Sequence, residues 1–309
     1  MPLYLTEADV AGLITAGEAV PVLEASFRRM AAGAVENVPR RRLRFGDGSF
    51  AVMSAVDREL GYAGVKAYTA TAGGAVFAVS LFDLGTGALA AVLEADAAGQ
   101  RRTGAASGVA ATYLARPDAR TLGVIGCGWQ AESQVEAIRA AVPTIERVVA
   151  YCRTPERLQA FCARVAAEPA ESPVDAAAQD VVVTITTSRD PVLRGDWLRE
   201  GALVCAAGAN DPSKRELDNV VLERASFVCC DSKENAKLES GDLIDPVESG
   251  LLDWLEVHEL HEVVAGDVPG RESDTDIVVF KSNGLAAWDV AIAAELVRRA
   301  RERGVGTTV

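Results

Sequence analysis

The residues with the clearest chemical meaning form a glycine-containing segment, Gly126–Ala131, whose pattern is G-x-G-x-x-A. An apolar run at residues 121–125 precedes it, and a helical pattern at residues 130–142 follows it. In such a strand–turn–helix, the first glycine allows a tight turn, the second lets the backbone approach a pyrophosphate, and the alanine keeps the helix close to the sheet. The helix N-terminus adds free N–H groups for the phosphates. The segment therefore predicts a dinucleotide site; the alternative is a plain glycine turn.

The residues after the next apolar run, residues 147–151, indicate which dinucleotide is bound. Enzymes that use NAD usually carry Asp or Glu there, which accepts a hydrogen bond from the ribose 2′-hydroxyl. This chain has Cys152, Arg153 and Thr154 instead, with no carboxylate. A guanidinium pairs well with a 2′-phosphate. We therefore predict that NADP(H) is preferred, with NAD(H) as the alternative, unless Arg153 is only a solvated surface residue.

The segment around this site alternates between apolar strands and helices. Continuous apolar strands separated by helices are typical of a parallel sheet that is covered on both faces. Besides the runs already named, we predict a helix at residues 155–165 and strands at residues 180–185, 202–207, 226–230 and 276–280. These patterns predict a Rossmann-type domain at residues 118–282.

The rest of the chain has a different pattern and predicts a smaller α+β domain. Helical spacing covers residues 6–33, with Thr6 and Asp9 as a capping pair at its start. Between residues 40 and 92, short runs separated by glycine turns indicate an antiparallel or mixed sheet. Further helices are predicted at residues 103–115 and 285–301. The predicted fold class is therefore α/β, with this second domain at residues 1–117 and 283–309.

Composition restricts the class of partner. The chain has 309 residues and a formal net charge of −13, so nucleic acid is not an expected partner, because binding it needs a basic face. No apolar run approaches the ~20 residues that a membrane helix needs, and residues 1–7 do not resemble a signal peptide. The six cysteines form no C-x-x-C pair and are expected to be reduced core residues. These features predict a cytoplasmic protein without a membrane partner.

Several motifs spread over nearly the whole length give the chain a family resemblance. They are Gly64–Lys66, Gln100–Ser107, Ile125–Gln130, Gly208–Asp218, Gly270–Asp274 and Ser282–Ala286. With them the chain resembles the ornithine cyclodeaminase/μ-crystallin family, whose members include archaeal-type alanine dehydrogenase and ketimine reductases. The resemblance implies a homodimer built on the N-terminal domain, which is then the dimerisation and substrate domain. It also implies chemistry at the α-carbon of an amino or imino acid beside a nicotinamide.

Three basic residues match the family's active-site positions. Arg41 and Arg102 match the arginines that bind the substrate carboxylate, and Lys66 matches the active-site lysine. Because Arg40 and Arg42 flank Arg41, the first assignment can shift by one residue. The residue types suit the chemistry, since a guanidinium binds a carboxylate through two hydrogen bonds and a lysine near cations can handle a proton. The alternatives are a solvated lysine, a structural ion pair at Arg102 and a surface arginine at position 41.

One departure from the family pattern separates the candidate activities. Cyclodeaminases of the family carry an aspartate where this chain has Asn210, which cannot act as a base. We therefore predict an NAD(P)H-dependent oxidoreductase that reduces an α-imino acid, cyclic or formed from a keto acid and an amine, or oxidises the amino acid. The alternatives are an ornithine cyclodeaminase-type ammonia lyase with retained NAD, and an NADP-dependent binding protein like μ-crystallin.

The predicted cofactor-binding residues lie in the glycine segment and after the later strands. They are Gly126, Gly128, Trp129, Gln130, Ala131, Arg153, Thr154, Thr186, Thr187, Gly208, Asn210 and Ser282. Thr186 and Thr187 are expected to approach the nicotinamide ribose, and Trp129 either packs or covers the cofactor. His258 and His261 are expected on a helical turn as polar surface residues, and no metal site is predicted.

Overall fold

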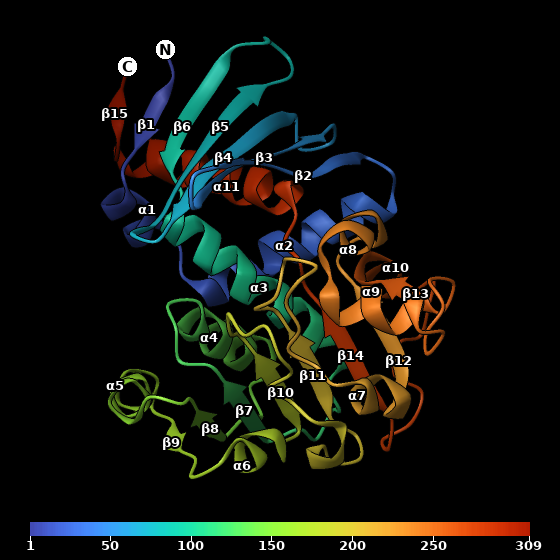
Figure 1. Ribbon diagram of the computed structural model, residues 1–309. Coiled ribbons are helices and arrows are strands. Elements are labelled where there is room, and N and C mark those ends of the chain that lie inside the picture. The colour runs from blue at the N-terminus through green and yellow to red at the C-terminus, as the bar shows by residue number, and fades with distance from the viewer. The chain divides into compact units, whose positions relative to one another are not determined.

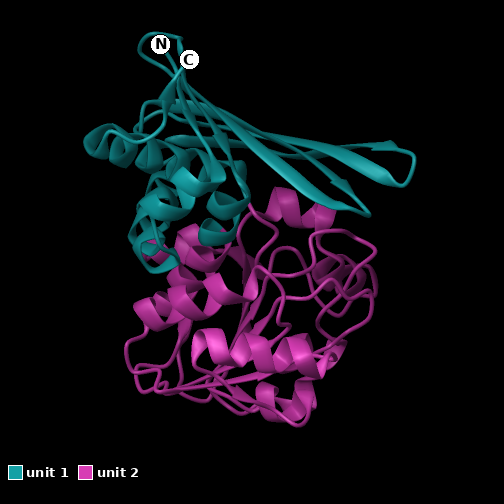
Figure 2. Cartoon of the chain, turned by 90° about the vertical axis from the view of Figure 1, so that its left-hand side faces the viewer, with its two compact units in different colours: residues 1–102, 285–309 teal, residues 103–284 magenta.

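The computed structural model describes all 309 residues, which form two compact units (Figures 1 and 2). Unit 1 comprises Met1–Arg102 and Leu285–Val309, and unit 2 comprises Thr103–Gly284. The sequence placed the first boundary at residue 117, where Pro117 ends a helical pattern. In the structure the chain changes unit inside one continuous helix, α3 (Asp96–Leu114), so no break in the sequence pattern marks that boundary.

Unit 1 is built on a seven-stranded mixed sheet. Its strands, in spatial order, are β15 (Thr307–Thr308), β1 (Leu3–Leu5), β6 (Leu89–Glu94), β5 (Gly74–Asp83), β4 (Tyr62–Thr71), β3 (Gly48–Asp57) and β2 (Val35–Phe45). Neighbours pair antiparallel except β1 with β6. The two ends of the chain therefore lie side by side at β1 and β15 (Figure 1).

Three helices accompany this sheet: α1 (Glu7–Leu13), α2 (Ala16–Ala31) and α11 (Ala286–Arg303). The helical pattern of residues 6–33 predicted one segment, but the structure has two, because Thr15 and Glu18 form a second capping box. The predicted cap of Thr6 and Asp9 is confirmed. Helix α11 packs on β3 and β4 and on α2, where Trp288 meets the Phe27 ring edge-on at 5.4 Å.

Strand β2 contains a bulge that matters for the site. Val38 pairs with Ser54 and Arg41 pairs with Val52, so Pro39 and Arg40 together oppose the single residue Met53. Proline has no N–H to donate to a ladder, and a bulge in this edge strand accommodates it. The bulge interrupts the strict alternation of side chains between the two faces of β2.

Unit 2 is built on an eight-stranded sheet in which every pairing is parallel. Its strands, in spatial order, are β13 (Val257–Glu259), β12 (Ala225–Cys230), β14 (Ile277–Lys281), β11 (Leu203–Ala206), β10 (Val181–Thr184), β7 (Thr121–Ile125), β8 (Arg147–Tyr151) and β9 (Glu168–Pro169). The helices are α4 (Ala131–Ala141), α5 (Pro155–Val165), α6 (Pro173–Ala177), α7 (Asn219–Arg224), α8 (Lys233–Glu239), α9 (Gly241–Glu248) and α10 (Leu260–Ala265). The predicted Rossmann-type α/β class is confirmed.

The strand order creates a switch point between β7 and β10. From β7 the chain turns first towards β8 and β9, then returns to the other side of β7 to build β10 and β11. Ligands of open α/β sheets bind beyond the carboxyl ends of the strands at such a point, because the connecting loops there diverge. A ligand of unit 2 is therefore expected to contact the residues that follow β7, β8 and β10.

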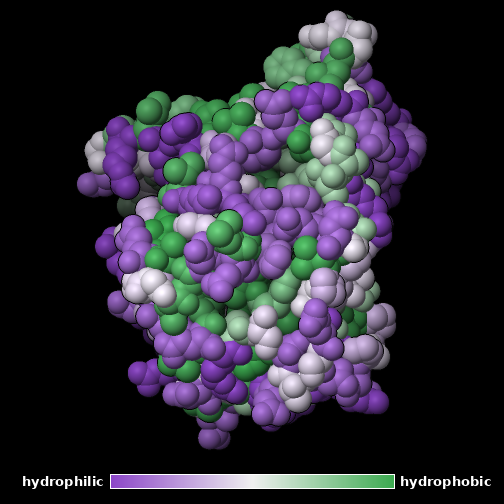
Figure 3. Space-filling view, turned by 90° about the vertical axis from the view of Figure 1, so that its right-hand side faces the viewer, coloured by the Kyte–Doolittle hydropathy of each residue, from purple (hydrophilic) through white to green (hydrophobic).

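Some large apolar side chains remain exposed. On the sheet of unit 1 they include Leu43, Phe50, Val76 and Phe82, whose cross-strand partners place them on the face opposite Lys66. Figure 3 colours one face of the molecule by hydropathy, and hydrophobic residues reach that surface among hydrophilic ones. No single helix is long and apolar enough to span a membrane. The pair α1 and α2 has the required length and composition only when the two helices are taken together, and they are bent by 83° relative to each other.

Candidate functional site

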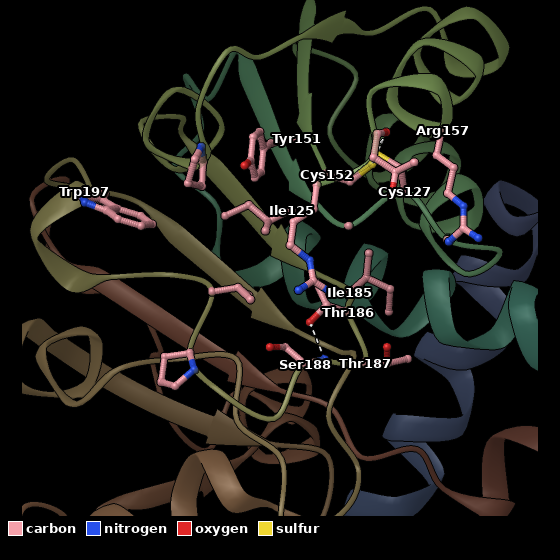
Figure 4. A pocket seen from close by; sticks show the side chains of 17 residues that line it. Ile125, Cys127, Tyr151, Cys152, Arg157, Ile185, Thr186, Thr187, Ser188 and Trp197 are labelled. Atoms are coloured by element: carbon pink, nitrogen blue, oxygen red, sulfur yellow. Dashed lines mark hydrogen bonds between the residues drawn. The ribbon is translucent and has the colours of Figure 1, made fainter.

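A cavity of about 500 Å³ lies at the switch point of unit 2 (Figure 4). Its wall comes from the segments that follow β7, β8 and β10. These contribute Gly126, Cys127 and Gly128; Cys152, Arg153 and Thr154; and Ile185, Thr186, Thr187 and Ser188. The cavity thus lies where the strand order predicts a ligand.

The two glycines of the predicted dinucleotide segment have different roles. Gly126 has φ +114°, and a Cβ atom there would lie 2.4 Å from the carbonyl oxygen of Ile185, so only glycine fits. At Gly128 a Cβ atom would meet no atom within 4 Å. Gly128 therefore leaves open space beside the start of α4, as a pyrophosphate that approaches the backbone requires. The segment fits a dinucleotide.

The charged side chains in the wall of the cavity are basic. Arg153 follows β8, and Arg157 lies four residues further on, in the first turn of α5. No Asp or Glu lines the cavity. Arg153 was predicted from the sequence and Arg157 was not, because the position after β8 was the only one considered for the 2′-phosphate.

A buried carboxylate, Glu216, fixes the two loops that follow β10 and β11. It accepts hydrogen bonds from the backbone N–H groups of Thr186 at 2.6 Å, Gly208 at 2.7 Å and Ala209 at 3.2 Å. Burial raises the pKa of Glu216, and the Lys281 ammonium opposes that rise. Glu216 thus holds Thr186 at the cavity, and the sequence reasoning missed it although it lies within the quoted Gly208–Asp218 motif.

Asp242 and Lys281 extend this network inside unit 2. Asp242 accepts from the backbone N–H groups of Glu216 and Leu217, and the Lys281 ammonium lies 3.0 Å from Asp242 Oδ2. Lys281 also donates to the carbonyl oxygen of Ala209 at 2.6 Å. The loops after β10 and β11 are therefore held by charge-assisted hydrogen bonds without exposure to water.

The other predicted cofactor residues lie outside the wall of the cavity. Gly208 contacts the backbone of Thr186, and Ser282 is buried with its hydroxyl 3.4 Å from Asp231. Trp129 is 54% exposed. The remaining residues of this group are Gln130, Ala131 and Asn210. Of the predicted set, Gly126, Gly128, Arg153, Thr154, Thr186 and Thr187 line the cavity.

Unit 1 contains a second candidate centre, a buried cluster of charged side chains around Asp289. The Lys66 ammonium lies 2.8 Å from Asp289 Oδ1, and Arg102 Nε lies 3.3 Å from the same oxygen. Lys66 is 3% exposed and Arg102 is 8% exposed. The structure thus brings two of the three predicted catalytic residues together and adds Asp289, which the sequence reasoning missed.

The third cation of the cluster is Arg40, where Arg41 was predicted. Lys66 pairs with Met53, and the bulge of β2 places Arg40 opposite Met53 on the same face of the sheet. Arg41 pairs with Val52, which puts it on the other face, where it is exposed. Of the three arginines between which the sequence left the assignment open, Arg40 is therefore the one that lies on the same face as Lys66.

The cluster has more positive charge than negative. Three cations, Arg40, Lys66 and Arg102, share one carboxylate, Asp289. Burial lowers the pKa of Lys66 to about 8; Asp289 opposes this, and Arg102 and Arg40 add to it. Burial also acts to raise the pKa of Asp289, but Arg102, Lys66 and Arg40 outweigh it and lower that pKa. The cluster therefore brings cationic groups together inside unit 1.

Comparison with known proteins shows the family of this chain. A sequence model of the ornithine cyclodeaminase/mu-crystallin family matches residues 2–304. The chain belongs to this family. It is 37% identical to an alanine dehydrogenase of Archaeoglobus fulgidus over 319 aligned positions, which cover 99% of this chain and 98% of the relative.

Solved structures of the family have the same fold. A Δ1-pyrroline-2-carboxylate reductase of Thermococcus litoralis, in complex with NADH and L-proline, matches with a TM-score of 0.93 and 32% identity, over 99% of this chain and all of the other. An archaeal alanine dehydrogenase dimer with bound NAD matches with a TM-score of 0.93 and 36% identity, over 100% of this chain and 98% of the other.

The two histidines of this chain do not line the cavity of unit 2. His258 lies on β13 rather than on the predicted helical turn, because β13 pairs in register with β12, and His261 follows in α10. The His258 ring stacks on Phe227 with centroids 4.9 Å apart. No group of three or more His, Cys, Asp or Glu side chains is arranged to hold a metal ion.

Proposed function

We propose that this chain is an NAD(P)-dependent oxidoreductase that interconverts an α-imino acid and the corresponding amino acid. The observation that supports this best is the buried cluster of Lys66, Arg102 and Arg40 around Asp289. A proton-handling lysine between two guanidinium groups suits a substrate that carries a carboxylate beside a C–N bond. The named relatives act on compounds of this kind.

Each cation of the cluster has a distinct role in the proposed reaction. Arg102 and Arg40 bind the substrate carboxylate through their guanidinium groups. Lys66, whose pKa is about 8, donates a proton to the substrate nitrogen during reduction and accepts it during oxidation. Asp289 positions Lys66 by its 2.8 Å contact and keeps the ammonium form available.

Unit 2 supplies the dinucleotide site. A bound nicotinamide dinucleotide would carry the hydride to or from the α-carbon, which no protein side chain can do. Gly126 and Gly128 shape the loop for the pyrophosphate, and Thr186 and Thr187 line the wall after β10. Arg153 and Arg157 are the residues that we propose bind a 2′-phosphate, so NADP(H) is expected to bind more tightly than NAD(H).

A cyclodeaminase activity is disfavoured by the loop after β11. Asn210 has no basic group to assist attack by an amine or by water. The neighbouring Asp211 carboxylate accepts hydrogen bonds from the backbone and the hydroxyl of Ser213, which commits it to a local turn. Imine reduction needs no base at this position.

The oligomer that we propose is a homodimer formed by the sheet of unit 1. Leu43, Phe50 and Val76 expose apolar surface on the face away from Asp289, and Leu43 is 68% exposed. A second copy of the same face would cover it through an isologous contact. The archaeal alanine dehydrogenase that this chain resembles is a dimer.

The decisive experiment follows nicotinamide absorbance with a panel of substrates. Cyclic imino acids, and keto acids supplied with ammonia or methylamine, should consume NADPH, whereas ornithine should yield little proline and ammonia. Efficient conversion of ornithine, with a cofactor that neither exchanges nor accumulates in reduced form, would replace the reductase by a cyclodeaminase. Dinucleotide binding without turnover of any substrate in the panel would favour a binding protein.

A further inference from the structure

Two of the six cysteines lie in the wall of the dinucleotide cavity. Cys127 is the residue between the two glycines, and Cys152 directly follows β8. Both are half-buried, whereas Cys162, Cys205, Cys229 and Cys230 are buried. The sequence analysis treated all six as core residues, which these two are not.

The backbone brings Cys127 and Cys152 next to each other. Ile125 and Tyr151 are register partners in the parallel pair β7–β8, and Gly126 N donates to the Tyr151 carbonyl oxygen at 2.9 Å. Cys152 directly follows Tyr151, and Cys127 directly follows Gly126, two residues beyond Ile125. The two cysteines are therefore offset by one residue from register partners, on segments that leave neighbouring strands about 4.8 Å apart. A disulfide spans roughly 4.4–6.8 Å between Cα atoms. The Cys152 sulfur is close enough to raise the pKa of the Cys127 thiol, and both side chains occupy the same corner of the cavity in Figure 4. The Cys152 thiol donates to the Thr154 carbonyl oxygen at 3.4 Å.

We propose that Cys127 and Cys152 form an oxidative modification site, in which a hydroperoxide converts the two thiols to a disulfide and thereby weakens dinucleotide binding. The weakened binding rests on the proposed function, because it assumes that the cavity holds a dinucleotide. The cross-link itself rests only on the placement of the two cysteines. In a reducing cytoplasm, where we expect this chain, the pair stays as two thiols.

The chemistry assigns different roles to the two sulfur atoms. Burial and the neighbouring Cys152 sulfur raise the pKa of the Cys127 thiol, so Cys127 keeps its proton and is a poor first nucleophile. Cys152 therefore attacks the O–O bond of hydrogen peroxide, forms a sulfenic acid and releases one water. The Cys127 sulfur then attacks the Cys152 sulfur, the S–O bond breaks, and the hydroxide leaves as a second water with the Cys127 proton. Two thiols are oxidised and one peroxide is reduced.

The bridge would distort the part of the loop that the phosphates need. A disulfide holds its sulfur atoms about 2.05 Å apart, closer than two unbonded thiols. Closing the bridge draws Cys127 and Cys152 together, and Gly126 on one side has little room to shift, because a Cβ atom there would lie 2.4 Å from the Ile185 carbonyl oxygen. The displacement therefore falls on Gly128, which borders the open space for a pyrophosphate.

A third sulfur offers a matched control. Cys162 on α5 lies close enough to raise the pKa of the Cys127 thiol further, but it is buried and does not line the cavity. The pairing of Cys127 with Cys152 therefore predicts that Cys162→Ser leaves the oxidation unchanged. Cys152→Ser should abolish it while keeping nearly the same side-chain volume.

The test uses the full chain, first reduced and then treated with hydrogen peroxide. Mass spectrometry without reductant should show a loss of about 2 Da and a linked pair of peptides that contain Cys127 and Cys152. The dissociation constant of NADPH, followed by its fluorescence, should rise by about tenfold or more on oxidation and return with dithiothreitol. The Cys152→Ser protein should show neither change, and the Cys162→Ser protein should show both.

The outcomes separate this proposal from the proposed function. No linked peptide, or a link through Cys162, overturns the modification site whatever the cofactor result. A Cys127–Cys152 link with unchanged NADPH affinity overturns its effect on binding. If the reduced protein binds neither NADPH nor NADH, the proposed function fails, and the effect on binding fails with it. In that case the peptide map still shows whether the Cys127–Cys152 cross-link forms.

Discussion

The two candidate centres of this chain are built in different ways. The cavity of unit 2 is shaped by backbone: two glycines, the segments that follow three strands of one sheet and the first turn of a helix. The cluster of unit 1 is shaped by side chains that are far apart in sequence, and Lys66 and Asp289 are separated by 223 residues. A backbone site depends on local conformation, whereas a side-chain cluster depends on how distant elements pack.

This difference decides how each centre should respond to substitution. In the cavity, most side chains can be substituted as long as the backbone of the glycine segment after β7 keeps its conformation. In the cluster, each charged group sets the pKa of the others, so the loss of one leaves the rest buried with an altered balance of charge. Substitutions in unit 1 should therefore affect chemistry, and substitutions in unit 2 should affect dinucleotide binding.

The largest effect is expected from Lys66→Ala. Loss of the proton donor should lower turnover by about 10²-fold or more, while the NADPH dissociation constant stays within about twofold because Lys66 lies in unit 1. Steady-state kinetics and fluorescence titration measure the two quantities separately. Lys66→Met, which keeps the apolar stem without the charge, controls for the cavity that alanine leaves. Turnover that persists in both variants would remove Lys66 from the mechanism.

A pair of arginine variants tests the assignment made from the bulge. Arg40→Ala should raise KM for the imino acid by about 30-fold, which corresponds to about 2 kcal/mol of lost charge-assisted hydrogen bonding. Arg41→Ala removes the same side chain from the opposite face and should leave KM nearly unchanged. The reverse result would place Arg41 in the substrate site.

Gly128→Ala tests the backbone character of the cavity. The added methyl group meets no protein atom within 4 Å, so the thermal midpoint of unfolding should not fall. It projects into the space that we assign to the pyrophosphate, and NADPH binding should weaken by about tenfold. Unchanged binding with unchanged stability would show that the dinucleotide takes another path.

The pKa of Lys66 sets the expected pH dependence. Reduction uses the ammonium form, so kcat/KM for the imino acid should be constant well below pH 8 and fall as the pH rises through about 8. At one pH unit above that pKa the loss is about tenfold, because about a tenth of the lysine remains protonated. Oxidation of the amino acid uses the neutral amine and should rise over the same interval. Parallel profiles in the two directions would contradict this assignment.

The smallest effect concerns the choice of dinucleotide. Arg153→Asp should weaken NADPH binding by about fivefold relative to NADH, because one of the two guanidinium groups in the wall, that of Arg157, remains. Arg157→Asp, one helical turn away, is the matched variant. Tighter binding of NADH than of NADPH by the unaltered protein would refute the proposed preference.

The difference between a backbone site and a side-chain cluster also decides how much of each centre could be predicted from the sequence. The strands at residues 121–125 and 147–151 and the helix at residues 155–165 match the structure residue for residue, because local pattern decides them. The glycine segment lines the cavity as expected. Asp289 was not predicted, and Arg40 was named only as an alternative to Arg41, since neither the packing of α11 on β3 and β4 nor the bulge of β2 has a local sequence signal.

The same bulge affects how this chain should be compared with its relatives. A strand that is one residue shorter here would lack either Pro39 or Arg40, and the residue that remains would still lie opposite Met53. An alignment can place the gap at either position at almost the same score, so matched columns need not contain the arginine that faces the same way. Equivalent arginines are identified by their cross-strand partner, Met53, and through it by Lys66. In this segment, evolutionary insertions and deletions should be counted along the ladder of strand pairs rather than along the chain.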